Sequence, residues 1–179
     1  SPGSPYKHWN HEVLPHWNER LRPKYPFDVS WNPPDDPHCP YMPLRGLYSS
    51  ADETILRAQF REMAEAGISV AVMSWWGRPD HPHTHDTQGV NTDAIVPAVL
   101  KAAAATNMHV AFHLEPYHGR TAETVKDDVK YIIDKYGDLP GVLKIRRMKP
   151  DAGDALVPLF YLYDSQHRTG MCVFALHST

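Results

Sequence analysis

The sequence of 179 residues predicts an α/β fold in which short parallel strands alternate with helices. Three apolar runs, at residues 70–73, 110–112 and 157–162, have the length and content of buried strands. Stretches with helical spacing separate these runs, and such alternation is typical of parallel strands joined by right-handed crossovers. Three strands cannot close an eight-stranded barrel. The prediction is therefore either a small open sheet or a partial (β/α)8 TIM barrel of about three βα units.

Length and composition are those of one domain with enough apolar content for a core. The net charge of −3 gives no support for a nucleic-acid partner, and no apolar run reaches the roughly 20 residues of a membrane span. We therefore predict no nucleic-acid partner and no direct membrane contact within this segment. Cys39 and Cys172 lie far apart and do not form a disulfide framework. The chain starts at Ser1 without Met, which indicates a piece of a longer protein.

Residues 1–50 are predicted to form a long N-terminal loop layer. Ten prolines in this stretch prevent long helices and disfavour central strands. Aromatic residues such as Trp9, Trp17 and Trp31 are too apolar for a disordered tail. An ordered loop layer over a scaffold is a frequent way of building a binding site.

The first predicted helix and strand follow directly. Residues 50–53 read as a capping box, an apolar stripe at helical spacing continues the helix, and Gly67 ends it. Residues 68–73 form a buried strand, and 77–90 form a long polar loop. A second helix is expected over about 93–106.

The second half repeats the pattern. Residues 108–113 form a strand, and a helix begins after Thr121 and ends at Gly137. The basic stretch 144–149 is expected to form a hairpin or loop. Residues 156–163 are expected to form one further strand, with Pro158 near its start.

The most informative polar residues end the middle strand. Alternate residues of an extended strand share a face, so His113, Glu115 and Tyr117 are predicted to point together into a pocket. In β/α barrels the active site lies at the C-terminal strand ends. Such a set can polarise hydroxyls, position a leaving group or orient a sugar. The alternative is a histidine and a glutamate that serve only the structure.

The two neighbouring strands also end in aromatic residues. Trp75 and Trp76 end the first strand, and alternation predicts that one ring packs in the core while the other faces the site, without deciding which. Tyr163 and Asp164 end the last strand. Asp164 is either an acid, base or hydroxyl acceptor, or a cap of the next turn. Aromatic rings beside a carboxylate and an imidazole suit a sugar ligand.

A metal site is a competing interpretation of the histidine-rich loop. His81, His83 and His85 alternate and precede Asp86, a spacing found in metal-chelating tracts. No fourth ligand with fixed spacing is evident, and a solvated loop explains the tract better. The sequence also lacks a P-loop, a dinucleotide-binding glycine motif, a nucleophile elbow and a CxxC pair. We therefore predict no metal and no cofactor.

Several motifs in register resemble the glycoprotein endo-α-1,2-mannosidases of glycoside hydrolase family 99. The resemblance covers about residues 5–165. It rests on Lys7-His8-Trp9-Asn10-His11, Asn32-Pro33-Pro34-Asp35-Asp36, Tyr48-Ser49-Ser50, Ser74-Trp75-Trp76, His113-Leu114-Glu115-Pro116-Tyr117, the 129–137 helix end and Phe160-Tyr161-Leu162-Tyr163-Asp164-Ser165.

The resemblance implies a (β/α)8 barrel in the Golgi lumen, usually tethered by an N-terminal membrane segment. It implies cleavage of glucosylated mannose, such as Glc-α-1,3-Man, from high-mannose N-glycans, with retention and without a metal. It places Trp75 in the substrate site, where this chain carries Trp76 in place of the usual Tyr that follows. It implies substrate-binding positions also at His113, Glu115, Tyr117 and Tyr163.

The resemblance also implies what this chain lacks. The first strand of the family, with its Trp-Tyr-Gly segment, would precede residue 1. The family's two catalytic glutamates lie in a Phe-Asn-Glu-Trp-His-Glu motif, which does not occur in these 179 residues, so no catalytic residue is predicted. The expected organisation is an incomplete barrel domain over 1–165 (loop layer 1–50, βα units 51–165) and a divergent tail over 166–179.

Three functions remain open from the sequence. The first is a glycosidase-related chain that carries part of the substrate-binding face. The second is a non-catalytic truncated or splice-variant product with weak glycan binding. The third is a metal-dependent hydrolase built on the histidine-rich loop.

Overall fold

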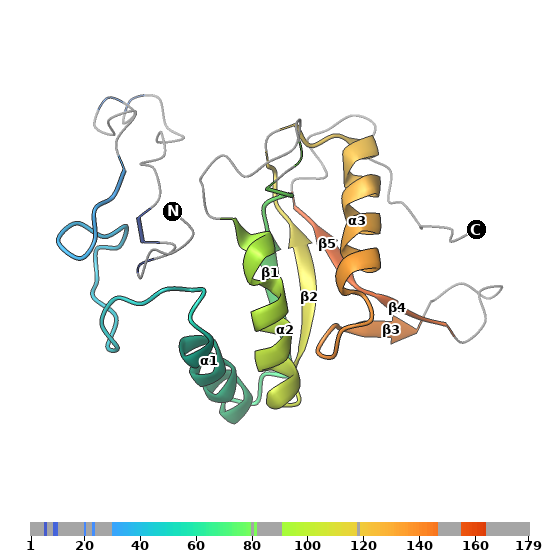
Figure 1. Ribbon diagram of the computed structural model, residues 1–179, viewed down its shortest axis with the longest axis horizontal. Helices are drawn as coiled ribbons and strands as arrows, with labels where there is room; N and C mark the ends of the chain where they lie inside the picture. The colour runs from blue at the N-terminus through green and yellow to red at the C-terminus, as the bar shows by residue number, and fades with distance from the viewer. Residues whose placement is uncertain are drawn as a thin grey trace.

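The computed structural model describes residues 6, 9–10, 20, 23, 30–79, 81, 91–117, 119–146 and 155–163 (Figure 1). Its elements, in chain order, are α1 (Glu53–Glu65), β1 (Val70–Trp75), the 3₁₀ helix η2 (Thr92–Ile95), α2 (Val96–Ala105), β2 (His109–Leu114), α3 (Ala122–Tyr136), β3 (Lys144–Arg146), β4 (Leu156–Pro158) and β5 (Phe160–Leu162).

Three parallel strands form the central sheet, in the order β1-β2-β5. Val70 pairs with His109, and Phe112 pairs with Phe160. Helix α2 connects β1 to β2, and α3 lies between β2 and β5 along the chain. This arrangement confirms the predicted alternation of helices with parallel strands. Within the described residues, no helix is both long enough and apolar enough to span a bilayer.

The last predicted strand is wrong in one respect, because residues 156–163 form two strands that belong to different sheets. Strand β4 pairs antiparallel with β3, and β5 pairs parallel with β2. The change occurs at Leu159, whose N–H donates to Leu143 O while its own carbonyl accepts from Phe112 N. Pro158, which has no N–H to donate, precedes the break. Residues 144–146 of the basic stretch form β3, which pairs with β4, and residues 147–149 lie outside the described part of the chain.

Helix α1 begins where the sequence indicates, although the cap differs from the predicted capping box. Asp52 is the N-cap, and its side chain accepts a hydrogen bond from Thr54 N at 2.7 Å. The predicted cap of α3 is confirmed, because Thr121 and Thr124 bond reciprocally. The 3₁₀ helix η2 directly precedes α2. Pro97 lies in the first turn of α2, where a backbone N–H has no partner within the helix, so the missing N–H of proline does not destabilise it.

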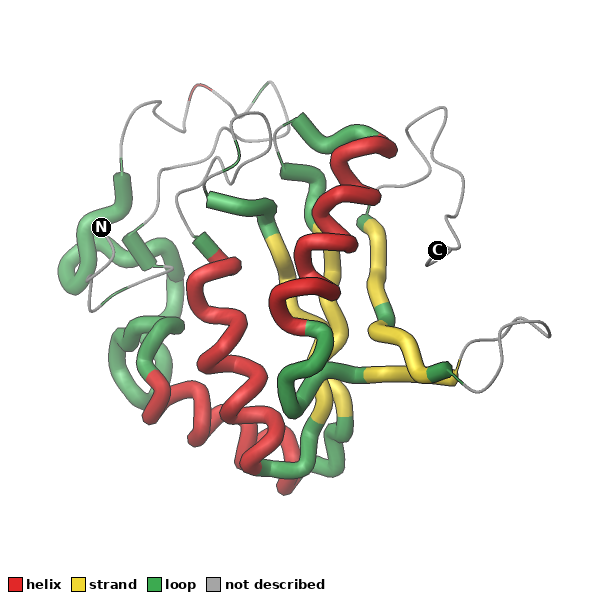
Figure 2. The backbone as a smooth tube through the Cα atoms, turned by 45° about the vertical axis from the view of Figure 1, so that its right-hand side comes forward, coloured by secondary structure: helices red, strands yellow, loops and turns green. Residues whose placement is uncertain are grey.

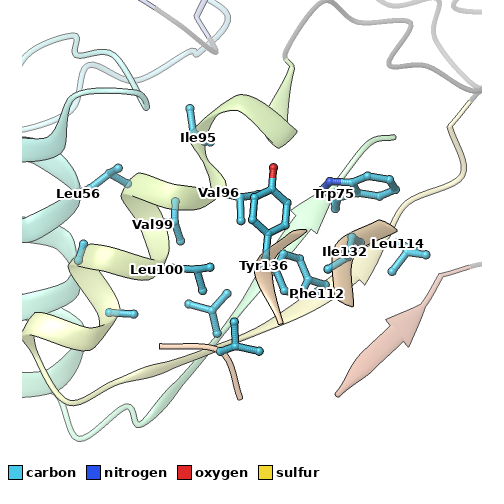
Figure 3. Close-up of a cluster of buried hydrophobic side chains, with 14 of the residues drawn as sticks. Leu56, Trp75, Ile95, Val96, Val99, Leu100, Phe112, Leu114, Ile132 and Tyr136 are labelled. Carbon is cyan, nitrogen blue, oxygen red and sulfur yellow. The ribbon is translucent and has the colours of Figure 1, made fainter. Parts of the chain in front are cut away.

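The helices lie on one side of the central sheet (Figure 2), and the hydrophobic core lies between the sheet and the helices (Figure 3). On β2, Val110, Phe112 and Leu114 alternate toward α2 and α3 and are at most 1% exposed. The other residues of the strand, among them His113, point to the opposite face. Val72, on that same opposite face of β1, is 49% exposed. The sheet therefore has one covered face and one open face.

Candidate functional site

On the open face, one carboxylate joins the ends of two neighbouring strands. Ser74, on β1, donates its hydroxyl to Glu115 Oε1 at 2.5 Å. His113 Nδ1, on β2, lies 3.3 Å from the same oxygen. Ser74 and His113 are register partners in the parallel sheet, so the fold itself places them side by side. His113, on β2, and Glu115, the first residue after it, therefore lie together at the end of the strand.

Tyr161 of β5 and Tyr163, the next residue after β5, flank the imidazole. The Tyr163 ring stands edge-on to His113 with ring centroids 5.7 Å apart, and the Tyr161 ring does so at 6.5 Å. Their exposed fractions are 54% and 46%. We predicted Tyr163 but not Tyr161. The signal was present, because residues two apart on a strand share a face and Tyr161 pairs with His113 across the sheet.

These groups offer complementary contacts to a hydroxyl-rich ligand. The Glu115 carboxylate can accept hydrogen bonds from ligand hydroxyls, and the imidazole of His113, whose Nδ1 lies beside it, has ring nitrogens that can donate or accept. The Tyr161 and Tyr163 rings add apolar area and phenol groups beside it. We define Ser74, His113, Glu115, Tyr161 and Tyr163 as the strand-end cluster.

Trp75 is the tryptophan that packs in the core. Its side chain is 0% exposed, and its Nε1 donates to Asp93 Oδ1 at 3.0 Å. The ring stands edge-on to Tyr117, with centroids 5.7 Å apart. The resemblance placed Trp75 in the substrate site, but the structure places it on the helix-covered face. Trp76 is partly buried at the margin of the core, and its backbone N–H donates to Thr92 Oγ1.

Tyr117 does not point with His113 and Glu115, so the alternation predicted for these three residues is wrong at its last member. The strand ends at Leu114, and Tyr117 N donates to Glu115 O, which is a turn. The Tyr117 side chain is 1% exposed, and its hydroxyl donates to Asp128 Oδ2 on α3. Burial, followed by the Asp128 carboxylate, raises the pKa of Tyr117 above its ordinary value.

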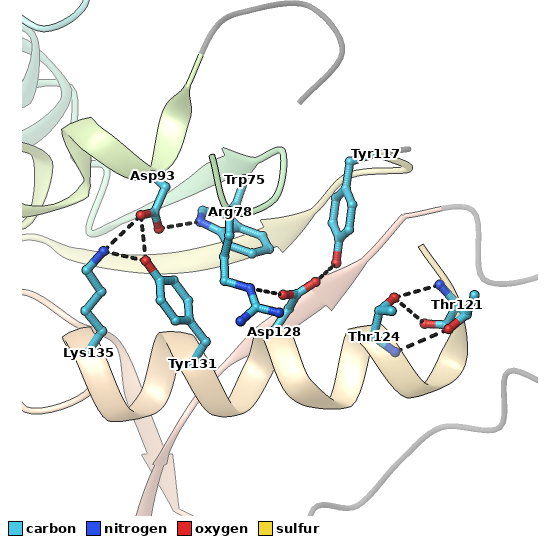
Figure 4. Close-up of polar contacts among 9 residues, drawn as sticks. All are labelled: Trp75, Arg78, Asp93, Tyr117, Thr121, Thr124, Asp128, Tyr131 and Lys135. Carbon is cyan, nitrogen blue, oxygen red and sulfur yellow. Dashed lines mark hydrogen bonds and ion pairs between the residues drawn. The ribbon is translucent and has the colours of Figure 1, made fainter. Parts of the chain in front are cut away.

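Asp128 is the centre of a buried charged group beneath the strand ends (Figure 4). Its side chain is fully buried, and Oδ1 lies 2.8 Å from Arg78 Nε. Burial raises the pKa of Asp128, while the bond from Tyr117 and the charge of Arg78 act in the opposite direction. Arg120, 1% exposed, donates from Nη1 to Leu114 O at 3.1 Å.

A second buried carboxylate, Asp93, fixes η2 to α3 (Figure 4). Besides Trp75, it accepts from the Tyr131 hydroxyl at 2.8 Å and from Lys135 Nζ at 3.0 Å. Burial alone would lower the pKa of Lys135, but its hydrogen bonds to Tyr131, Tyr136 and Asp93 outweigh that effect and raise it. This carboxylate is satisfied by three donors and serves the packing of Trp75.

Some predicted site residues lie outside the described part of the chain. These are Asp164, at the end of the last strand, and the loop residues His83, His85 and Asp86. Across the described residues, no group of three or more His, Cys, Asp or Glu side chains is placed to hold a metal ion.

A surface cavity of about 280 Å³ lies between the loop layer and α1. None of its lining residues comes from the strand ends; they are Pro43, Leu44, Arg45, Tyr48, Gln59 and Glu62.

Parallel βα units with a polar cluster at their strand ends are typical of the β/α-barrel class. The sequence matches Glycosyl hydrolase family 99 over residues 2–172, and the chain belongs to this family.

Relatives agree with this assignment. The chain is 40% identical over 160 residues to the glycoprotein endo-alpha-1,2-mannosidase of Mus musculus, a match that covers 89% of this chain and 33% of the relative. It is 41% identical to the Homo sapiens glycoprotein endo-alpha-1,2-mannosidase-like protein, with the same coverage. The chain thus spans about a third of the length of these relatives.

A solved structure matches the fold as well. The GH99 endo-alpha-mannosidase from Bacteroides thetaiotaomicron superposes with a TM-score of 0.63 and is 32% identical in sequence. The superposition covers 88% of this chain and 40% of that enzyme. The sheet described here is therefore part of a barrel, as the second of the two predicted fold alternatives states.

Proposed function

We propose that this chain carries the sugar-holding side of an endo-α-1,2-mannosidase-like site, and that the ligand is the glucosylated mannose of a high-mannose N-glycan. The observation that carries the proposal is the strand-end cluster, where His113, Glu115 and Tyr163 meet on the open face. The cluster supplies hydrogen-bond acceptors for sugar hydroxyls and exposed rings for the apolar face of a pyranose.

Trp76 belongs to the same proposal. Successive residues of a strand point to opposite faces, and Trp75 points into the core. Trp76 follows the last residue of β1 and is partly buried against the core. We propose that the part of its ring that stays exposed contacts the sugar.

The proposal separates recognition from hydrolysis. Retaining glycosidases use acidic side chains on both sides of the scissile bond or a substrate group in place of one of them. Within the described residues, the strand-end cluster contains one carboxylate, Glu115, which is already bonded to Ser74 and His113. The glutamate motif of the family does not occur in this sequence. We therefore assign binding, and no bond cleavage, to this chain.

Localisation in the Golgi lumen completes the proposal. It is supported by the family membership and by relatives that are named glycoprotein endo-alpha-1,2-mannosidases. High-mannose N-glycans attached to glycoproteins are the partners that this compartment would present.

Calorimetric titration with the disaccharide Glc-α-1,3-Man tests the proposal. Replacing Glu115 with Gln keeps the size of the side chain but removes the charge that Ser74 and His113 contact. Because charge-assisted hydrogen bonds contribute about 1.5–3 kcal/mol, we expect binding to weaken at least about tenfold. Glu65→Gln on exposed α1 is the matched control and should leave Kd unchanged. No saturable binding by the wild type would refute the proposal, and an unchanged Kd for Glu115→Gln would refute the role of the cluster.

A further inference from the structure

One buried carboxylate holds two chain segments that leave neighbouring strands. Asp128 Oδ1 lies 2.8 Å from Arg78 Nε, and Asp128 Oδ2 accepts from the Tyr117 hydroxyl. Arg78 comes from the segment that follows β1, and Tyr117 from the segment that follows β2. Asp128 itself lies on α3, near the middle of the helix. Figure 4 shows the Arg78 and Tyr117 side chains reaching down to this one residue from above the helix.

Both segments carry residues of the proposed sugar site. Arg78 lies two residues after Trp76, and Tyr117 lies two residues after Glu115. The two segments are also bonded to each other, because Glu115 N donates to Trp75 O at 3.0 Å. A displacement of either Arg78 or Tyr117 would therefore also move Trp76 and Glu115, the site residues that these two segments carry.

The burial of Asp128 makes its contacts obligatory. The side chain is 0% exposed, so no water can replace a partner that is lost. A buried carboxylate held by the Tyr117 hydrogen bond and by the charge of Arg78 has few alternative arrangements, whereas apolar packing alone tolerates small rotations of a loop. Fixing a binding site to within about 0.5 Å requires this kind of supporting contact.

Resting on the proposed function, we propose that Asp128 is a positioning residue that sets the geometry of the sugar site through Arg78 and Tyr117. Asp128 lies on the covered side of the sheet and acts on the site through these two partners. Its removal should loosen the Trp76 and Glu115 segments together, and glycan affinity should fall for that reason.

Hydrogen exchange with Asp128→Asn tests the positioning role without any ligand. We expect the amide protons of Trp76, Glu115 and Tyr117 to exchange about tenfold faster than in the wild type, since their segments open locally. The matched control is Val129→Ala, which shortens the next side chain on α3, a core residue that is 7% exposed. In Val129→Ala, exchange should rise evenly through α3 and the sheet. The same even pattern for Asp128→Asn would overturn the proposal.

Titration with Glc-α-1,3-Man gives the functional readout. Asp128→Asn should weaken binding about tenfold, while Val129→Ala should leave Kd within about twofold of the wild type. If the two variants lost the same amount of affinity for the disaccharide, Asp128 would act only through the stability of the fold, and the proposal would be wrong. If the wild type does not bind the disaccharide, the proposed function fails, and the exchange pattern still decides the positioning role.

Tyr117→Phe is the second variant, in case Asp128→Asn does not fold. It keeps the ring and deletes the hydroxyl that Asp128 holds. We expect faster exchange at Glu115 and Tyr117 and about a threefold loss of affinity, because one of the two contacts remains. Where Asp128→Asn folds, its double variant with Tyr117→Phe should lose less than the sum of the two single losses, since both changes act on the contact between Tyr117 and Asp128. Additive losses would contradict the proposal.

Discussion

Replacing Trp75 with alanine should lower the free energy of unfolding by about 4 kcal/mol, since a fully buried Trp is removed and a large cavity is left. The side chain is 0% exposed and contacts Tyr117 and Tyr131. The change also removes one of the donors to Asp93, a carboxylate that is itself only 3% exposed. Domains are stable by about 5–15 kcal/mol, so this single change removes a large part of the stability.

Urea denaturation measures this difference, and the neighbouring tryptophan provides the control. Trp76→Ala should cost about 1–2 kcal/mol, because Trp76 is only partly buried and its described hydrogen bond to Thr92 comes from the backbone. The opposite order of the two losses would contradict the assignment of Trp75 to the core and Trp76 to the site.

The second large effect is expected at Gly141, where the chain returns from α3 to the sheet. Its φ is +91°, and an added Cβ would lie 2.6 Å from the backbone oxygen of Leu100. Its own carbonyl accepts from Val110 N at 2.7 Å, so the peptide cannot shift without breaking a bond to β2. We expect Gly141→Ala to lower the free energy of unfolding by about 2–4 kcal/mol, since backbone strain and overpacking act together.

Gly67 separates the two causes. Its φ is +82°, but an added Cβ there meets nothing within 4 Å. Gly67→Ala should therefore cost only the conformational part, about 1–2 kcal/mol. Chemical denaturation of both variants gives the comparison. Equal losses at the two glycines would show that the close approach to Leu100 has no energetic consequence.

Local sequence patterns predicted the elements of this fold well. The α3 cap is specified by Thr121 and Thr124, and its apolar stripe by residues spaced three or four apart. The buried strands are specified by short apolar runs. The split at Leu159 could not be predicted, because it depends on which strands lie beside residues 156–163 in space.

The site was predicted only in part, since side-chain direction depends on where each strand ends. A shift of one residue exchanges the two faces of a strand, so the sequence did not decide between Trp75 and Trp76. Tyr117 was expected on the open face because the alternation was continued past the strand end, although Pro116 lies between, and the structure has a turn there. Asp128 was missed for a different reason. A single acidic residue in an amphipathic helix is predicted to face solvent unless its buried partners are known.

Nuclear magnetic resonance of the wild-type chain titrated with Glc-α-1,3-Man tests the central claim most directly. Our account predicts that the largest shifts occur in the strand-end cluster, at His113, Tyr161 and Tyr163, with little change at Trp75. It also predicts no release of free sugar during the titration. Shifts centred instead on the cavity beside Tyr48, or an absence of shifts at saturating sugar, would contradict the claim that this chain holds a glycan at its strand ends.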